Sequence, residues 1–250
     1  LNAQNSRMQV ISNNLANVNT TGFKRDRANF ETLLYQVLKT SGAQTTGETK
    51  TLSGFNVGTG VKIINTDKLF SQGNIVTTDN ALDLAVDGSG FFQILIPDGR
   101  IGYTRAGVFG KNAEGLLTNP SGFVVQPEIE IPEGATSINV SSDGIVSVQL
   151  PGQVDAEEVG QLQLADFANP TGLQPIGQNL LIETPASGPP IVENPFTNGF
   201  GKLVQGALES SNVNVVQELV EMIETQRAYE VNSKAISGSD DMLRFVNQNL

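Results

Sequence analysis

Carboxylates are the residues whose type and spacing come closest to a chemical site in this sequence. The regularly spaced or adjacent ones are Asp79, Asp83 and Asp87 at steps of four, the pair Glu157 and Glu158, and the pair Asp240 and Asp241. Two carboxyl groups suffice for glycoside hydrolysis, provided that they face one another at a set separation. Adjacency in sequence does not set that separation, and each of these acids falls in an expected turn or on an exposed helix face. The carboxylates therefore predict no hydrolase.

The motifs for bound ions and cofactors are incomplete. Asp83, Asp87 and Gly88 do not form a calcium loop of the EF-hand type, which needs acids at alternate positions. Gly88-Ser89-Gly90 is half of a dinucleotide fingerprint and lacks the third glycine, so a strand turn is the better interpretation. The chain has no His, Cys or Trp, which removes Ser-His-Asp and Cys-His machinery and the usual ligands of zinc, haem and iron–sulfur clusters. We therefore expect no enzyme and no cofactor.

The overall charge argues against a nucleic-acid partner. Of 250 residues, 15 are Lys or Arg and 26 are Asp or Glu, which gives a net charge of -11. Affinity for phosphates comes from Lys and Arg, so this balance disfavours nucleic acid. No apolar run approaches the roughly 18 residues of a membrane helix. The longest run, residues 91–96, predicts a buried strand between Gly90 and Pro97. We expect no membrane insertion, and the N-terminus shows no signal-peptide pattern.

The N-terminal residues carry a helical stripe. Its apolar members are Leu1, Met8, Ile11, Leu15 and Val18. The positions between them are mostly Asn, Gln and Ser, and because Asn is a poor helix former, this helix needs a partner. Residues 17–22 predict a helix stop and a turn. A second short helix is predicted over residues 28–39 from the apolar residues Phe30, Leu33, Leu34, Val37 and Leu38.

The middle of the chain has a different texture. Residues 40–60 are rich in Thr, Ser, Gly and Gln and show little periodicity, which predicts a polar loop, a linker or a segment that orders only on contact. From residue 73 to 198, turn signals recur between short β-prone runs, and Asp98-Gly99 and Asp143-Gly144 predict hairpins. The spacing indicates an all-β domain of roughly ten strands, a sandwich or an irregular barrel.

The helical period returns after Gly199. It predicts a long helix over residues 212–249, whose apolar stripe includes Val216, Leu219, Val220, Ile223, Ala228, Val231, Met242, Leu243 and Val246. Because so small a β-domain cannot bury so long a helix, we expect the two ends to pair. The predicted fold class is α+β, with paired long N- and C-terminal helices, coiled-coil-like, flanking an irregular all-β domain and an extended polar loop between. Four divisions are predicted. Residues 1–39 form the N-terminal helical part of an inner core domain, residues 40–72 an extended loop region, residues 73–200 a β-rich outer domain, and residues 201–250 the C-terminal helix of the inner core domain.

The charge is distributed unevenly along these divisions. Residues 73–200 carry a net -12, whereas residues 1–39 carry +3 and residues 201–250 carry -3. Opposite signs favour association of the two ends modestly, and the acidic middle is expected to face solvent. The alternative interpretation of the acidic middle is a generic acidic surface.

Both ends of the chain carry long motifs. The N-terminal motif includes Asn13, Asn14, Leu15, Ala16, Asn17, Gly22, Phe23 and Lys24. The C-terminal motif includes Glu209, Ser211, Asn212, Val213, Gln226 and Arg227. Together with Gly90-Phe91-Phe92 and the run from Tyr103 to Gly107, these motifs make the whole chain resemble the rod–hook axial proteins of the bacterial flagellum. A segment over residues 167–180 and the polar stretch up to Gly60 resemble the distal-rod members of that family.

The resemblance implies a hollow helical tube, with terminal helices around a central channel and the β-domain outside. It implies a structural subunit of the distal rod, straight and rigid, that transmits torque and forms the export channel. The implied partners are copies of the same chain, proximal rod proteins, the hook, the P ring and L ring bushing, and the flagellar type III export apparatus. The implied location is the basal body in the periplasm, from peptidoglycan to outer membrane, reached without a cleaved signal peptide. The alternatives are a proximal rod or hook subunit or, from another class, a secreted adhesin or carbohydrate-binding module.

Three hypotheses about self-assembly follow. Residues 40–60, including Ala43, Gln44, Thr45, Gly54, Phe55 and Gly60, are expected to wedge between neighbours and straighten the tube; simple disorder is the alternative. The apolar stripes of the terminal helices are expected to be covered partly by neighbouring subunits, the alternative being an intramolecular two-helix core. The Asn residues at 13, 14, 17 and 19 fit turn and cap chemistry, or a register-fixing contact across subunits.

Overall fold

Segments from both ends of the chain and from residues 26–67 gather into one of two units. The computed structural model describes residues 2–40, 53–152 and 155–248. The first unit comprises Leu1–Asn13, Asp26–Asp67 and Val216–Leu250, and the second comprises Asn14–Arg25 and Lys68–Val215. We name them the helix–ribbon unit and the β-rich unit.

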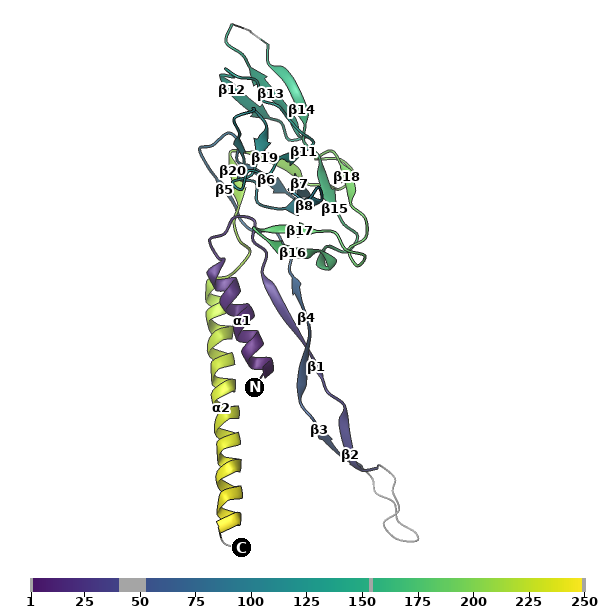
Figure 1. Ribbon diagram of the computed structural model, residues 1–250, viewed down its shortest axis with the longest axis vertical. Helices are drawn as coiled ribbons and strands as arrows, with labels where there is room; N and C mark the ends of the chain where they lie inside the picture. Colours follow the sequence, from purple (N-terminus) through teal and green to yellow (C-terminus); the bar gives the residue numbers. More distant parts are fainter. Residues whose placement is uncertain (1, 41–52, 153–154, 249–250) are drawn as a thin grey trace. The chain divides into compact units, whose positions relative to one another are not determined.

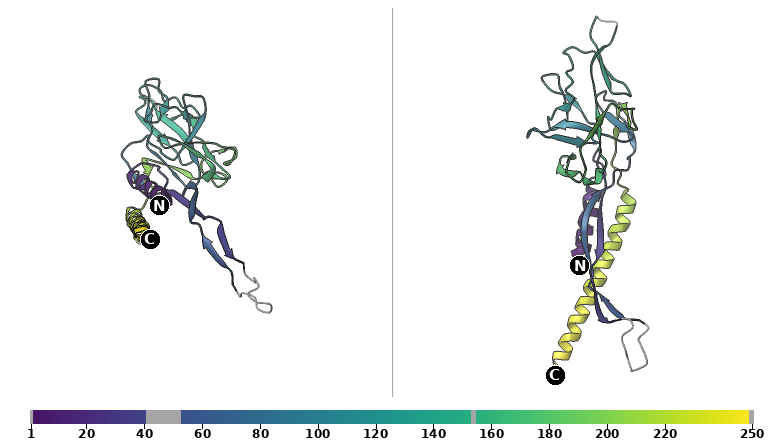
Figure 2. Two further views of the ribbon diagram at one scale, coloured as in Figure 1. Left: turned by 60° about the horizontal axis from the view of Figure 1, so that its bottom comes forward. Right: turned by 90° about the vertical axis from the view of Figure 1, so that its right-hand side faces the viewer.

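Two α-helices stand at the two ends of the described chain. α1 is Asn2–Ala16, of 15 residues, and α2 is Val215–Gln248, of 34 residues. α2 confirms the long C-terminal helix, and Glu218 in its first turn suits the positive end of the helix dipole. Both views show α1 beside the first part of α2 (Figures 1 and 2), and Arg7 Nη2 lies 3.6 Å from Glu221 Oε2.

The expectation of paired long helices is wrong, although the α+β class is consistent. At 1.5 Å per residue, α1 is about 22 Å long and α2 about 51 Å, so α1 accompanies less than half of α2. The helix stops at Ala16 because turn residues follow it. The N–H of Asn17 donates to the carbonyl of Asn14 at 3.1 Å, and Gly22 takes a left-handed φ of 67°.

The helix predicted over residues 28–39 is also wrong, because this stretch forms two strands. β1 (Asp26–Thr32) pairs with β4 (Val61–Lys68), and β2 (Tyr35–Lys39) pairs antiparallel with β3 (Phe55–Gly58). Side chains support the first pairing: Asn29 Nδ2 donates to Asn65 Oδ1 at 3.0 Å, and Arg27 Nη2 donates to Asp67 Oδ2 at 2.9 Å. Apolar residues at helical spacing therefore sit on a two-stranded ribbon, whose partner strands lie far along the chain.

The β-rich unit holds the remaining strands (Figure 1). They are β5 (Ile75–Thr77), β6 (Leu84–Asp87), β7 (Phe91–Leu95), β8 (Ile101–Thr104), β9 (Gly110–Lys111), β10 (Leu117–Thr118), β11 (Val125–Gln126), β12 (Ser137–Val140), β13 (Ile145–Gln149), β14 (Glu157–Gln161), β15 (Leu164–Asp166), β16 (Gln174–Gly177), β17 (Leu180–Ile182), β18 (Ile191–Glu193), β19 (Lys202–Gln205) and β20 (Ala207–Glu209). A 3₁₀ turn, η1 (Pro170–Gly172), precedes β16.

Antiparallel sheets organise these strands. The largest has the order β16-β17-β8-β7-β15-β18, with β11 also paired to β7, and a separate sheet has the order β12-β13-β14. The pairs β19-β6, β20-β5 and β10-β9 complete the unit. Asp98-Gly99 joins β7 to β8 and Asp143-Gly144 joins β12 to β13, so both predicted hairpins are confirmed.

Strand β7 is the centre of the hydrophobic core. Its side chains alternate between two buried clusters, with Phe92 and Ile94 in one and Phe91 in the other. Phe91 contacts the ring of Phe70 edge-on at 5.4 Å, and Phe92 contacts that of Phe109 at 5.0 Å. The run at residues 91–96, which is apolar except for Gln93, thus contains a strand that is buried on both faces.

Tyr103 on β8 belongs to the same core. Its ring meets Phe167 edge-on at 4.7 Å, and it is 2% exposed. Burial, with a smaller contribution from the charge of Glu183, raises the pKa of Tyr103 to about 12. The phenol of Tyr103 is therefore neutral in the folded unit at ordinary pH.

Candidate assembly surfaces and the junction of the two chain ends

The C-terminal helix leaves its apolar stripe uncovered in a single chain. The exposed members are Val216, Leu219, Val220, Ile223, Val231, Met242 and Leu243, of which Val216 is 71% exposed. Ala228 is half-buried, and Gln226 and Arg227 of the C-terminal motif are exposed on the same helix. An apolar stripe of this length that is exposed in a single chain indicates a surface that another molecule covers.

The N-terminal stripe is largely covered within the chain. Ile11 is buried, and Met8, Leu15 and Val18 are half-buried, whereas Ala16 is exposed. Leu1 lies outside the described residues, as does the side chain of Val246. The two predicted helical stripes therefore differ, because α1 is mostly satisfied internally and α2 is not.

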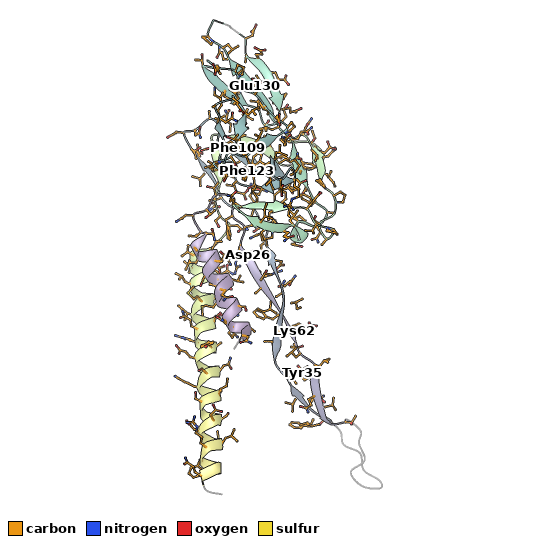
Figure 3. The ribbon with its side chains drawn as sticks, in the orientation of Figure 1. Asp26, Tyr35, Lys62, Phe109, Phe123 and Glu130 are labelled. Atoms are coloured by element: carbon orange, nitrogen blue, oxygen red, sulfur yellow. The ribbon has the colours of Figure 1, made fainter. Side chains whose placement is uncertain are left out.

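The ribbon presents a second apolar surface that the sequence interpretation missed. Its exposed apolar residues are Phe30, Leu33, Leu34, Tyr35, Val37, Leu38, Phe55, Val57, Val61 and Ile64, and Leu34 is 91% exposed. Figure 3 labels Tyr35 and Lys62 on this ribbon, where Lys62 pairs with Glu31 at 3.3 Å. A two-stranded ribbon is marginal in water, and its edges hold unpaired backbone groups. The ribbon therefore needs a neighbour.

The predicted wedge residues fall partly on this ribbon. Phe55 lies on β3, and Gly54 and Gly60 flank it. Ala43, Gln44 and Thr45 lie outside the described residues. The wedge itself stays a prediction.

The motifs of the two chain ends meet in the β-rich unit around one buried carboxylate. Lys24 Nζ lies 2.6 Å from Glu209 Oε1, and Arg105 Nη1 lies 3.5 Å from Glu209 Oε2. The N–H of Gly73 also donates to Glu209 Oε1, at 2.8 Å, and Lys24 donates to the carbonyl of Ser71 at 2.8 Å. All three charged side chains are buried. We name this group the Lys24–Glu209–Arg105 cluster.

Burial disfavours the charged forms of the two cations of the cluster. Loss of solvation lowers the pKa of Lys24, although the hydrogen bond and the charge of Glu209 act in the opposite direction. Loss of solvation also lowers the pKa of Arg105, against the attraction of Glu209 and then of Asp166. One carboxylate thus compensates two buried cations only in part.

Backbone contacts complete this junction. The N–H of Gly22 donates to the carbonyl of Glu209 at 2.8 Å. Asn212 Oδ1 accepts from the N–H of Arg25 at 2.7 Å, and Asn212 Nδ2 donates to the carbonyl of Leu69 at 2.7 Å. Phe23 and Val213, which adjoin these residues in the sequence, are buried. The hydroxyl of Ser211 accepts a hydrogen bond from the N–H of Val213 at 3.3 Å. Motif residues that are far apart in sequence therefore have a common structural role.

The asparagines of the N-terminal motif have local partners. Thr20 Oγ1 donates to Asn17 Oδ1 at 3.1 Å, and Asn14 is buried. Asn13 Nδ2 donates to Asp26 Oδ2 at 3.3 Å within the helix–ribbon unit. The Asn17–Thr20 contact belongs to the turn after α1, whereas the Asn13–Asp26 contact links α1 to β1. A register-fixing role across subunits stays a prediction.

Sequence reasoning did not select Arg105 as a site residue. It was visible only as one member of the run from Tyr103 to Gly107, with no local sign that it is buried beside Glu209. The sequence signal at Arg105 is limited to a single Arg between β-prone residues, followed by the small residue Ala106, and this signal does not indicate burial.

The evenly spaced carboxylates have structural roles. Asp83 accepts from Thr78 Oγ1 at 2.8 Å and from Asn80 Nδ2 at 3.0 Å, and Asp87 pairs with Lys202 at 3.3 Å. In the described part of the chain, no group of three His, Cys, Asp or Glu is placed to hold a metal ion. Nor does any described helix have the length and apolarity needed to cross a membrane.

Comparison with known proteins identifies the family. Three family models match: "Flagella basal body rod protein" over residues 1–24, "Flagellar hook protein FlgE/F/G D1 domain" over residues 85–148, and "Flagellar basal body rod FlgEFG protein C-terminal" over residues 204–249. The flagellar basal-body rod protein FlgG of Buchnera aphidicola subsp. Acyrthosiphon pisum is 51% identical over 248 residues, which cover 99% of this chain and 95% of the relative. The chain belongs to the FlgG family of flagellar basal-body rod proteins.

A comparison within one bacterium separates this family from a related rod protein. The FlgG of Caulobacter vibrioides is 47% identical over 98% of this chain and 94% of its own length. The FlgF of the same bacterium is 32% identical over 95% of this chain and 89% of its own length. FlgG relatives are structural rod proteins and not enzymes, which agrees with the expectation from composition.

Proposed function

We propose that the chain is the subunit of the flagellar distal rod, a straight, rigid and hollow helical tube. The observation that supports this function best is the uncovered apolar stripe of α2 in a member of a rod-protein family. A head-to-tail contact that does not close on itself generates a filament, and copies of the same chain are then the molecules that cover the stripe. A torque-transmitting shaft follows from such a tube, and its lumen provides the export path.

The same family membership supports the further partners. The ends of a distal rod adjoin the proximal rod and the hook, and the P and L rings surround it as a bushing. The subunit reaches this place through the flagellar type III export apparatus. The assembled rod lies in the periplasm and extends from the peptidoglycan to the outer membrane. An adhesin or a carbohydrate-binding module is disfavoured, since the 51% identity to a rod protein extends over 99% of the chain.

A single charge on the α2 stripe should prevent polymerisation. Val231 is 66% exposed in the single chain, so Val231→Asp is expected to leave the fold intact while placing a desolvated charge in every subunit contact. Electron microscopy and sedimentation should show no tubes, with an unchanged circular dichroism melt. Val231→Leu, which keeps the site apolar, is the matched control and should polymerise. Full-length tubes from Val231→Asp would refute the proposal for α2.

The ribbon is proposed to make the tube straight. Deleting residues 43–57 is expected to give curved polymers, because the wedge between neighbours is lost. Since this deletion also removes most of β3, a second variant that combines Leu34→Ser with Phe55→Ser keeps both strands and removes only exposed apolar surface. Curvature in electron micrographs of both variants supports the wedge. Straight rods from both would show that the ribbon does not determine the shape.

A further inference from the structure

A cavity adjoins the Lys24–Glu209–Arg105 cluster in the β-rich unit. It measures about 220 Å³. Its apolar lining includes Phe23, Phe70 and Phe91, and its polar lining includes the exposed Gln178 and the half-buried Asn179. Lys24 and Arg105 both line it, so two cations of the cluster face a space with aromatic sides.

The cations of the cluster have hydrogen-bond donors to spare. Arg105 offers five N–H groups, and its bonds to described residues are those to Val86 O, Gly88 O and Glu209 through Nη1 and Nη2. Among the described residues, the buried Arg105 Nε has no acceptor. Lys24 offers three N–H groups and donates to Ser71 O and Glu209. A buried donor without an acceptor costs free energy, which an incoming acceptor would recover.

The charge of the cluster is also incompletely balanced. Glu209 is the carboxylate in contact with both cations. Asp166 attracts Arg105 at longer range, and Asp166 Oδ1 accepts from the N–H of Phe167 at 2.9 Å. A second carboxylate in the cavity would place two oxygens beside two desolvated cations. Hydrogen bonds between such charged partners are stronger than those between neutral groups.

We propose that this cavity binds one carboxylate group, supplied by an exposed Asp or Glu side chain of a second copy of the chain. The aromatic wall accepts the apolar stem of that side chain, and the cations accept its head. The chain is itself the nearest source of carboxylates in a polymer, since residues 73–200 carry a net -12. The identity of the molecule that supplies the carboxylate rests on the proposed self-assembly, whereas the binding of a carboxylate by the cavity does not.

The carboxylate chemistry is tested on the full chain under conditions where it stays monomeric. Benzoate is titrated into isotope-labelled protein and followed by NMR, with saturable shifts expected at the amides of Phe23, Gln178 and Asn179. Arg105→Lys keeps the charge but removes Nε, and it should weaken binding about tenfold, the effect of one lost charged hydrogen bond. The absence of saturable shifts, or equal affinity in Arg105→Lys with an unchanged melt, overturns the proposal.

An exposed position at the mouth separates this effect from misfolding. Gln178→Glu adds a carboxylate at the rim of the cavity and should abolish benzoate binding without lowering the melting temperature. Gln174→Glu makes the same charge change at an exposed position of β16 outside the cavity, and it should bind benzoate like the unchanged chain. Equal binding by both variants overturns the proposal.

Polymerisation identifies the source of the carboxylate. If a neighbouring copy supplies it, Gln178→Glu should raise the concentration needed for polymerisation about tenfold, whereas Gln174→Glu should not. Benzoate should inhibit polymerisation over the range in which it binds. If Gln178→Glu polymerises normally although it no longer binds benzoate, the cavity takes a free anion, and the proposal that a second copy supplies the carboxylate is overturned. Failure of the unchanged chain to polymerise under any condition refutes the rod function and leaves the binding result standing.

Discussion

Glu209→Gln should lower the free energy of unfolding of the β-rich unit by about 3–5 kcal/mol, the usual effect of removing one partner from a buried ion pair. The change keeps the shape of the side chain and removes its charge. Lys24 and Arg105 would then be buried without their shared carboxylate, and both lose a charged hydrogen bond. The cost arises mainly from the two stranded cations and not from the lost attraction itself.

Urea unfolding followed by tyrosine fluorescence and circular dichroism measures this effect. Glu133→Gln is the matched control, since Glu133 is exposed in the same unit, and it should change stability by less than about 0.5 kcal/mol. Adding Lys24→Met to Glu209→Gln should recover part of the loss, because the double variant removes one of the stranded charges. A Glu209→Gln chain as stable as the unchanged protein, or additive losses in the double variant, would contradict the assigned role of the cluster.

Gly107→Ala should destabilise the same unit by at least about 3 kcal/mol, the upper range for an overpacked core. A Cβ on Gly107 would lie 1.6 Å from the carbonyl oxygen of Leu84 and 3.2 Å from the ring of Phe92. The backbone at this point is fixed, because the N–H of Leu84 donates to the carbonyl of Gly107 at 2.9 Å. Relief of the clash therefore requires β6 to move away from the core.

Gly110→Ala tests whether the effect is steric and not a general response to losing a glycine. Gly110 is close to Gly107 in sequence, but no atom beyond its own residue and its two chain neighbours lies within 4 Å of a Cβ added there. Its variant should stay within about 1 kcal/mol of the unchanged chain in urea unfolding. Equal stability of the two variants would show that the approach of Gly107 to Leu84 is not a constraint.

Local sequence signals predicted the elements that depend on local chemistry. The Asp-Gly turns fix their hairpins because glycine takes the left-handed φ that the turn needs, 83° at Gly99 and 89° at Gly144. The run at residues 91–96 is apolar except for Gln93, and it contains β7 (Phe91–Leu95), whose two faces pack into separate buried clusters. The C-terminal helix has enough periodic turns to be recognised within a few residues of its ends.

Non-local partners decided the elements that were predicted wrongly. Residues 28–39 have apolar groups at helical spacing, but β3 and β4 supply strand partners that no local window contains. The role of Arg105 was hidden for the same reason, because its carboxylate lies 104 residues further along the chain. The motif residues Gly22, Lys24 and Glu209 were selected by resemblance, and only the structure assigns them a common physical role.

The long sequence separation within the cluster affects the order of folding. Lys24 and Glu209 lie 185 residues apart, so their contact closes almost the whole of the β-rich unit into one loop. Loop closure over such a distance is slow, and it cannot begin before residue 209 is available. A chain synthesised from its N-terminus therefore exposes most of its length before Lys24 and Glu209 can meet. The charged cluster can therefore form only when nearly all of the β-rich unit is present, whereas α2 still follows it in the chain.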